Sequence, residues 1–271
     1  MDPRLQRRVQ RYGWDKAATY YDQYWAEQLA PAQDRVLAMA QIRNGEWVLD
    51  VACGTGLVTF RAAESVGPGG RVVATDISDV MVQRVTEIAA QRGMPQVTAE
   101  RSDAEEIIQG DETFDVVLCA LGLMYVVDPL RALEQMRRVL RPGGRVAVAV
   151  WGQRSRCGWA EIFPIVERRV ASDVCPLFFQ LGSGDALQYA LARTAYEDIE
   201  VERISATLSY DSGESACGAA FAGGPVALPY SRFDPPTRDE VHAEYLTSIA
   251  PYRRGDGYEV PGEFVIARAT R

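Results

Sequence analysis

The chain has 271 residues, of which 47% are hydrophobic, a formal net charge of −8 and a single histidine. This length accommodates one α/β domain with additions, the charge argues against a nucleic-acid backbone as the main partner, and no apolar run reaches the roughly 18 residues that a membrane span needs. The amino-terminal residues lack the apolar stretch of a secretory signal and the cysteines lack the spacing of a zinc site or a disulfide framework, so we expect a cytoplasmic protein without a bound metal, a nucleic-acid partner or stable membrane insertion.

Residues 1–42 precede the first expected strand and carry a helical pattern. Pro31 begins a second expected helix that runs to about Ala40. Two interpretations are open: a pair of helices that covers one edge of the core, or an N-terminal helical lid that closes over a ligand. We expect the lid, because apolar and aromatic side chains recur at helical spacing at Trp14, Ala17, Ala18, Tyr21, Tyr24, Trp25 and Leu29.

Residues 43–152 alternate strictly between expected strands and helices. The continuous Val, Ala and Leu strands and the amphipathic helices predict an α/β fold with a doubly wound, mostly parallel sheet covered by helices on both faces. A turn at residues 141–144 is expected to lead into the fifth strand. The expected strands are Trp47–Val51, Arg71–Thr75, Val97–Arg101, Phe114–Cys119 and Arg145–Val150, and the expected helices are Leu57–Ser65, Ser78–Arg92 and Pro129–Leu140.

The alternation breaks after residue 152. Residues 153–183 form a first insertion, and the core resumes over 184–211 with a helix near Asp185–Thr194 and a strand at Ile199–Leu208. A second insertion covers 212–258, and 259–271 hold the last strand of the core. Both insertions are too long for ordinary loops and follow the carboxyl ends of strands, where α/β sheets bind ligands. We expect helical caps that enclose a substrate; peripheral decoration is the alternative.

A glycine turn follows the first strand in the segment Val48–Gly56, whose sequence is VLDVACGTG. Gly54 and Gly56 permit backbone conformations and a close ligand approach that a Cβ would forbid. The G-x-G-x-x-G fingerprint of dinucleotide sites is incomplete, because Thr59 stands at its last glycine. Asp50 places a carboxylate beside the turn, where a pyrophosphate would be repelled. The turn therefore favours a nucleoside with a cationic end, such as S-adenosylmethionine.

Four further segments follow in order and spacing: VVATDIS, RSDAEEI, FDVVLCALGLMY and VLRPGGRVAV. With VLDVACGTG they make the chain resemble a class I S-adenosylmethionine-dependent methyltransferase, similar to the quinone-biosynthesis subgroup, over about residues 45–152. The resemblance implies a seven-stranded Rossmann-like sheet and S-adenosylmethionine as the cofactor. Its motifs are specific for the cofactor and say little about the methyl acceptor.

The resemblance also implies a set of cofactor-binding residues. Asp76, at the end of the second strand, accepts both ribose hydroxyls, and a helix N-terminal charge is the alternative. Asp103 accepts a hydrogen bond from the adenine amino group, and the alternative is a cap of a short helix over 104–108. Ile77 lies against the adenine, the Ala104 amide faces a ring nitrogen, and Met81 is a further cofactor-binding residue. The turn and the methionine part involve Asp50, Ala52, Cys53, Gly54, Gly56, Cys119, Ala120 and Leu121, and Tyr21 closes near the cofactor.

The expected reaction is methyl transfer to an N, O or C atom of a small, partly apolar metabolite, by in-line displacement in an enclosed pocket. C- or O-methylation of an isoprenoid quinone or lipid is the alternative within enzymes. A non-catalytic S-adenosylmethionine-binding regulatory or assembly protein is an alternative of another class, and arsenite methylation at Cys157, Cys175 and Cys217 is a further one. The sequence indicates no oligomeric state. The cap aromatics expected to line the pocket are Phe178, Phe179, Phe221, Tyr230 and Tyr245.

No catalytic residue is apparent in the sequence. The lone histidine, His242, lies in an expected helix that begins at Thr237. An imidazole is the usual proton acceptor near neutral pH, but no carboxylate partner is apparent, and transfer from an activated sulfonium needs no general base in every case. We expect that His242 is not an indispensable general base.

Overall fold

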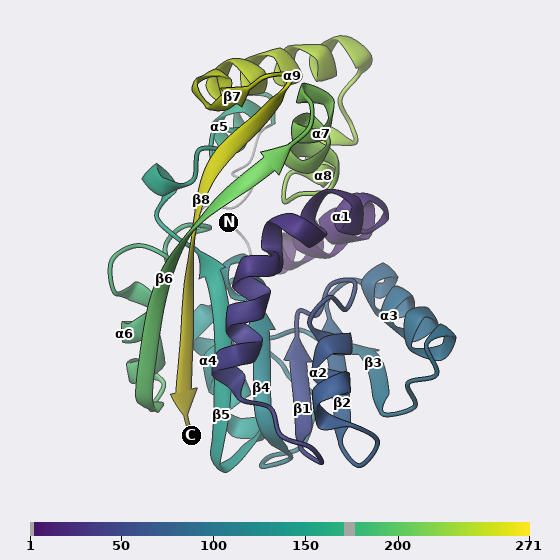
Figure 1. The fold of residues 1–271 in the computed structure, drawn as a ribbon, viewed down its shortest axis with the longest axis vertical. Helices are drawn as coiled ribbons and strands as arrows, with labels where there is room; N and C mark the ends of the chain where they lie inside the picture. Colours follow the sequence, from purple (N-terminus) through teal and green to yellow (C-terminus); the bar gives the residue numbers. More distant parts are fainter. Residues whose placement is uncertain (1–2, 171–176) are drawn as a thin grey trace.

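A computed structural model describes residues 3–170 and 177–271 of the chain. Its centre is one twisted sheet with helices on both faces (Figure 1). Seven strands lie in the order β3-β2-β1-β4-β5-β8-β6. Strands β1 to β5 pair in parallel, while β8 runs antiparallel to both β5 and β6. The prediction of a doubly wound, mostly parallel, seven-stranded Rossmann-like sheet is confirmed.

The central strands are buried on both faces, as the mostly apolar sequences of β1 (WVLDV) and β4 (FDVVLCA) predict. A short extra strand, β7 (Arg253–Arg254), pairs with the start of β8. The strands of the main sheet are β1 (Trp47–Val51), β2 (Arg71–Asp76), β3 (Val97–Arg101), β4 (Phe114–Ala120), β5 (Leu140–Trp151), β6 (Glu197–Tyr210) and β8 (Gly257–Thr270).

Polar side chains cap the helices that follow the strands. Ser78, Asp128 and Asp234 each accept a hydrogen bond from a backbone N–H in the first turn of α3, α4 and α9. The helices are α1 (Pro3–Ala40), α2 (Thr59–Val66), α3 (Asp79–Gln91), α4 (Pro129–Val139), α5 (Ile162–Glu167), α6 (Ala186–Arg193), α7 (Gly213–Cys217), α8 (Ala227–Tyr230) and α9 (Pro235–Ser248). Short helical turns cover η1 (Leu123–Tyr125), η2 (Arg154–Arg156), η3 (Gly218–Ala222) and η4 (Ala250–Tyr252).

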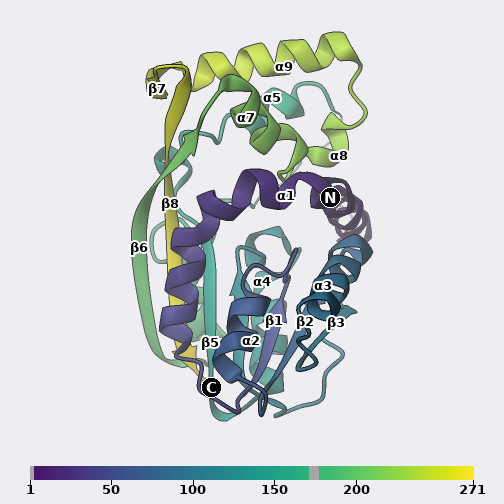
Figure 2. The same cartoon turned by 45° about the vertical axis from the view of Figure 1, so that its right-hand side comes forward.

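The prediction of two N-terminal helices divided at Pro31 is wrong, because α1 continues through this residue. A proline inside a helix removes one backbone hydrogen bond and bends the axis without having to end the helix. Helix α1 changes direction along its length, so that one part follows the sheet and another crosses above it (Figure 2). Burial of Trp25, Leu29, Ala32 and Val36 on both sides of the proline supports the continuous helix.

Strands β2 and β4 end one residue later than expected, and three others differ more from their expected bounds. Residues 141–144, expected as a turn, lie inside β5 as an irregularity, since Phe114 pairs with Leu140 and Val116 with Arg145. Strands β6 and β8 are both longer than expected and stay paired as far as Tyr210 and Tyr258. This pair of strands extends past the sheet toward the region that holds α7 and α9 (Figure 1).

The helices of the two insertions gather beyond the carboxyl ends of the parallel strands. Helices α5, α7, α8 and α9 form this layer, and α1 passes between it and the sheet (Figure 2). Arg168 and Arg169, just after α5, form ion pairs with Glu244 of α9. Helix α1 contacts α8 and η3 on its upper side and α3 on its lower side, so segments far apart in the sequence enclose one region.

Arg145 of β5 joins the end of α1 to the sheet. Its guanidinium makes two hydrogen bonds with the Glu46 carboxylate, at 2.9 and 2.7 Å, and donates to the backbone oxygens of Ala40 and Gln41. Arg145 is only 9% exposed. A paired, well-bonded guanidinium tolerates such burial, whereas loss of one partner leaves a charge without compensation.

Replacement of Arg145 by methionine is expected to lower the free energy of unfolding by about 3 kcal/mol, because it leaves the Glu46 carboxylate without its partner. Urea denaturation measures this loss. The matched control is Arg61→Met, which removes an exposed ion pair to Asp34 and should cost less than about 1 kcal/mol. Equal losses in the two variants would show that Arg145 does not fasten α1 to the sheet.

Candidate functional site

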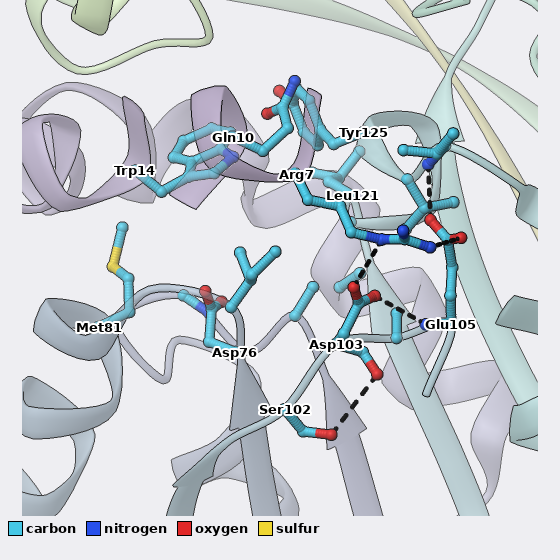
Figure 3. Close-up of a pocket in the computed structure, with 18 of the residues that line it drawn as sticks. Arg7, Gln10, Trp14, Asp76, Met81, Ser102, Asp103, Glu105, Leu121 and Tyr125 are labelled. Carbon is cyan, nitrogen blue, oxygen red and sulfur yellow. Dashed lines mark hydrogen bonds and ion pairs between the residues drawn. The ribbon is translucent and has the colours of Figure 1, made fainter. Parts of the chain in front are cut away.

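A cavity lies at the carboxyl ends of β1, β2 and β4, beneath α1 (Figure 3), and its empty volume, with the space open to solvent included, is about 750 Å³. The structure brings most of the expected site residues together here. Those that line it are Tyr21, Ala52, Gly54, Asp76, Ile77, Met81, Asp103, Ala104, Ala120 and Leu121. Asp50 and Cys53 line a smaller adjoining cavity of about 290 Å³, while Gly56 and Cys119 line neither. We call the larger space the nucleoside cavity.

The glycine turn takes the backbone conformations expected for it. Gly54 and Gly56 have φ angles of 56° and 92°, and a Cβ on Gly56 would lie 2.6 Å from the Phe60 ring. Ala52 also has a positive φ, 56°, which an L-residue adopts at an energetic cost. Local strain is therefore held at the bottom of the nucleoside cavity.

Asp50 is buried beneath this turn, with 1% exposure. The Thr59 hydroxyl donates to its Oδ2 at 2.6 Å, so the residue that replaces the last glycine of a dinucleotide fingerprint holds the carboxylate in place. Burial raises the pKa of Asp50 to about 7, against the opposing effect of the Thr59 hydrogen bond. A cation beside Asp50 would stabilise its ionised form.

Asp76 ties the turn to the start of α3. Its Oδ2 accepts the Gly54 N–H and its Oδ1 accepts the Ser78 N–H, both at 2.9 Å. Burial raises the pKa of this carboxyl to about 6, although the two N–H donors lower it. Each carboxylate oxygen can accept further hydrogen bonds, so Asp76 retains acceptor capacity toward the nucleoside cavity.

Asp103 lies at the other end of the nucleoside cavity and is held by Arg7 of α1. Arg7 Nε lies 2.9 Å from Asp103 Oδ2, and its Nη2 lies 2.5 Å from Glu105 (Figure 3). The alternative that Asp103 caps a short helix over 104–108 is wrong, because no helix forms there. Its Oδ1 instead accepts the Glu105 N–H at 2.9 Å, an Asx-type turn.

Sequence reasoning missed Arg7, Gln10 and Glu105 in this wall. Glu105 is 3% exposed, and its second oxygen accepts the Val127 N–H at 2.8 Å. Arg7 and Gln10 come from the start of α1, more than 90 residues before Asp103 in the sequence. No local sequence pattern therefore indicates that Arg7 and Gln10 lie near Asp103. Glu105, by contrast, falls inside the RSDAEEI segment.

Polar contacts hold α1 above the nucleoside cavity. Asp15 accepts the Ser78 hydroxyl at 2.6 Å, and Asp22 pairs with Arg84 of α3 at 3.0 Å. Tyr21 lies between Asp15 and Asp22 in the sequence and lines both the nucleoside cavity and the smaller cavity that contains Asp50. Burial raises the pKa of its hydroxyl, so this phenol stays protonated.

A second, smaller cavity, which we call the aromatic cavity, adjoins the nucleoside cavity. The two share Trp14, Tyr21, Leu121 and Tyr125. The Trp14 ring meets Tyr125 edge to face at 4.9 Å, an arrangement that aromatic rings favour. The rest of its lining is Trp25, Leu29, Met124, Trp151, Trp159, Gly223, Gly224 and Pro225.

The expected set of pocket-lining cap aromatics is wrong. Phe178 and Phe179 pack against Trp159, with ring centroids 5.6 and 5.8 Å away, and line neither cavity. Phe221, Tyr230 and Tyr245 form a separate cluster. The caps instead contribute Trp159 and the small residues 223–225. Periodicity predicts that an aromatic side chain is buried, but not which of two buried layers contains it.

His242 belongs to this separate cluster. Its Nε2 lies 2.9 Å from the Tyr230 hydroxyl, and its ring stacks on Phe221. Burial lowers the pKa of this imidazole. His242 lines neither the nucleoside cavity nor the aromatic cavity, so the expectation that it is dispensable remains a prediction.

The cysteines of the described segments are buried. Burial raises the pKa of Cys157 and Cys217 to about 12, which disfavours the thiolates that metalloid binding requires. Cys175, the third cysteine considered for this role, lies outside the described residues. Within residues 3–170 and 177–271, no cluster of His, Cys, Asp and Glu could hold a metal ion, and no helix is long and apolar enough to cross a membrane.

Residues 42–162 match the family described as a methyltransferase domain. The chain is 28% identical to nocamycin O-methyltransferase of Saccharothrix syringae, over 89% of this chain and 91% of that protein. It is 32% identical to a ubiquinone/menaquinone biosynthesis C-methyltransferase of Idiomarina loihiensis, over 69% and 74% of the two chains. Phosphoethanolamine N-methyltransferase 2 of Haemonchus contortus, solved with S-adenosylhomocysteine, shares the fold: the TM-score is 0.62 and the identity 18%, over 95% of this chain and 57% of that one.

Ionisation of Asp50 is expected to destabilise the fold as the pH rises. Its pKa is about 7 in the folded chain against an ordinary 3.8, so the folded chain keeps a proton that the unfolded chain has lost. The stabilising contribution is full below about pH 4 and is lost progressively up to about pH 7. We predict that Asp50→Asn removes this slope, at most about 1.4 kcal/mol per pH unit, from urea unfolding measured at a series of pH values.

The control for this experiment is Asp256→Asn, at an exposed carboxylate in the turn before β8. This variant should keep the pH dependence of the unmodified protein. An Asp50→Asn stability curve that runs parallel to that of the unmodified protein would contradict the prediction.

Proposed function

Because this chain belongs to the S-adenosylmethionine-dependent methyltransferases, we propose that it transfers the methyl group to a small, uncharged, partly apolar metabolite held in the aromatic cavity. The observation that carries this proposal is the junction of the two cavities. Trp14, Tyr21, Leu121 and Tyr125 line both, so a ligand in one would meet a ligand in the other there.

The residues of the nucleoside cavity fit the proposed cofactor. The buried carboxylates of Asp50 and Asp76 have raised pKa values, and a ligand with an ammonium and a sulfonium group would favour their ionised forms. We propose that Asp50, through the turn at Ala52, Cys53, Gly54 and Gly56, faces the cationic end. Asp76 would bind the ribose hydroxyls, and Ile77, Met81, Asp103 and Ala104 the adenine. Cys119, Ala120 and Leu121 would border the methionine part, with Tyr21 above.

The proposed role of the protein in the reaction is mainly to position the acceptor and exclude water. When bound, S-adenosylmethionine supplies an activated methyl group, which the acceptor atom takes up in line with the departing sulfur. Apolar side chains around the junction keep water from the acceptor and hold it in one orientation. Ala120 offers no polar side chain to the methyl acceptor. The walls of the aromatic cavity would therefore orient the acceptor.

The share of this chain that each of two relatives matches favours a small metabolite over a quinone as the methyl acceptor. The relative named for nocamycin O-methylation matches 89% of this chain, whereas the quinone C-methyltransferase matches 69%. Since the enclosing segments lie at both ends of the methyltransferase core, similarity over nearly the whole chain includes more of the acceptor side. Methylation of an isoprenoid quinone or lipid is the second candidate, supported by the higher identity of that relative, and a strong detergent dependence of turnover would favour it.

Removal of the Asp76 carboxylate is expected to weaken cofactor binding. Asp76→Ala should reduce the binding free energy of S-adenosylmethionine by about 1.5–3 kcal/mol, the range for hydrogen bonds to a charged group. Titration calorimetry with S-adenosylmethionine and with its demethylated product measures the effect, and Asp256→Ala serves as the matched surface control. Unchanged affinity in Asp76→Ala would mean that this residue is only a helix N-terminal charge. In the unmodified protein, tighter binding of NAD than of either nucleoside would overturn the proposed cofactor site.

His242→Ala is expected to reduce turnover only a few-fold, because the imidazole bonds to Tyr230 rather than lining a cavity. Loss of a true general base costs on the order of 100- to 10,000-fold. Steady-state rates with an identified acceptor distinguish the two. A loss on that larger scale, with cofactor affinity and thermal unfolding unchanged, would establish His242 as the base.

A further inference from the structure

A buried glutamine of α1 lacks a hydrogen-bond partner. Gln33 is only 7% exposed, and its neighbours Ala32 and Val36 on the same side of the helix are fully buried in the core. Between Pro31 and the end of α1 at Ala40, a stretch that the structure describes completely, Gln33 is the one polar side chain that is buried. Its amide forms no hydrogen bond with any group in the described part of the chain. A buried amide costs free energy unless a partner meets it.

The amide of Gln33 is open to the small cavity beside Asp50, which we call the Asp50 cavity. Its lining is Tyr21, Gln33, Asp50, Ala52, Cys53, Gly54, Leu57, Val58 and Ala120. Some buried polar atoms of the described chain have no partner and also no accessible surface, such as the indole nitrogens of Trp25 and Trp159, but the Gln33 amide is not among them. A ligand atom in the Asp50 cavity can therefore reach this amide.

The Asp50 cavity has room for one small group. Its empty volume of about 290 Å³ includes space open to solvent, and the centre of a water molecule can occupy only about 20 Å³ of it. On this measure, about 10–15 Å³ is enough for one water molecule. An ammonium group is similar in size to a water molecule, whereas a carboxylate group is larger. The space therefore favours an ammonium group.

The charge of the lining favours a cation as well. Among the described residues, Asp50 has the only charged side chain that lines this cavity. Its Oδ2 accepts the Thr59 hydroxyl at 2.6 Å, and its Oδ1 has no donor within the described chain. A second carboxylate would meet charge of the same sign here, whereas an ammonium group brings three N–H donors. Asp50 Oδ1 and the Gln33 amide oxygen, Oε1, are two acceptors on one cavity that these donors would satisfy.

Resting on the proposed function, we propose that the ammonium group of S-adenosylmethionine enters the Asp50 cavity and donates a hydrogen bond to Gln33 Oε1, beside Asp50. The methionine part then passes from the nucleoside cavity into the Asp50 cavity between Tyr21 and the glycine turn. The residues that these two cavities share are Tyr21, Ala52, Gly54 and Ala120. Gln33 is thus a specificity-determining residue for the amino-acid end of the cofactor.

Two features of α1 hold Gln33 at this position. The helix continues through Pro31 instead of ending there, so that residue 33 stays on the buried side. Arg145 donates to the backbone oxygens at the end of the helix and fastens it to the sheet. Helix α1 therefore places Gln33 at one end of the cofactor site and Arg7, which pairs with Asp103, at the other.

The test uses three nucleosides that differ at the amino-acid end. S-adenosylhomocysteine carries an ammonium and a carboxylate group, its decarboxylated analogue carries the ammonium group alone, and 5′-methylthioadenosine carries neither. Calorimetric titrations compare the unmodified protein with Gln33→Met, which keeps the length of the side chain and removes the amide. The first two nucleosides should bind more weakly by the same factor, about 10- to 100-fold, the scale of a hydrogen bond to a charged group. 5′-Methylthioadenosine should keep its affinity.

A second variant and a control accompany this comparison. Gln33→Leu also removes the amide and should give the same pattern as Gln33→Met, and thermal unfolding checks the fold of each variant. The matched control is Gln23→Met, at an exposed glutamine of the same helix. This variant should bind all three nucleosides as the unmodified protein does.

Two results would overturn this inference alone. One is an equal change for all three nucleosides in the Gln33 variants, including no change at all. The other is a loss for S-adenosylhomocysteine that its decarboxylated analogue does not share, because Gln33 would then bind the carboxylate. Failure of all three nucleosides to bind the unmodified protein would overturn the proposed cofactor site, and this inference with it.

Discussion

The arrangement of the site depends on two carboxylates buried at the ends of neighbouring strands. Asp50 and Asp76 lie under and beside one glycine turn, and burial raises the pKa of both. Each is kept in place by donors from the chain itself: the Thr59 hydroxyl for Asp50, and the Gly54 and Ser78 N–H groups for Asp76. A pyrophosphate would add charge of the same sign to this region, whereas a cationic nucleoside reduces the cost of ionising both groups. Gly54, one of the residues with a positive φ at this turn, is the one whose N–H reaches Asp76.

Helix α1 converts this open end of the sheet into an enclosed site. Arg145 fastens one end of the helix to the sheet, and Arg7 near the other end pairs with Asp103 and Glu105. Between these contacts the helix contributes side chains to both cavities, and those above the nucleoside cavity are seen in Figure 3. The same helix therefore supports the fold, covers the nucleoside cavity and borders the aromatic cavity, so a change of its bend would affect all three.

The two cavities differ in the polarity of their linings. The nucleoside cavity is lined by the carboxylates of Asp76, Asp103 and Glu105 and by Arg7, while the aromatic cavity is lined by rings, aliphatic side chains and three small cap residues. In the proposed function, methyl transfer takes place at the border that the two cavities share, and water is excluded from it.

The sequence by itself determined the sheet and most of the nucleoside cavity, since both depend on local patterns: buried strands, glycine turns and the acidic residues that end β1 and β2. It also placed Asp76, Asp103 and Leu121 correctly near one another, because the carboxyl ends of parallel strands meet at one edge. Only the tertiary structure decided that α1 runs unbroken through Pro31, that Arg7 reaches Asp103, and that Trp159 rather than Phe178 or Tyr245 lines the aromatic cavity. These outcomes depend on which buried layer each side chain enters and on contacts between distant segments, and neither is encoded in the spacing of neighbouring residues.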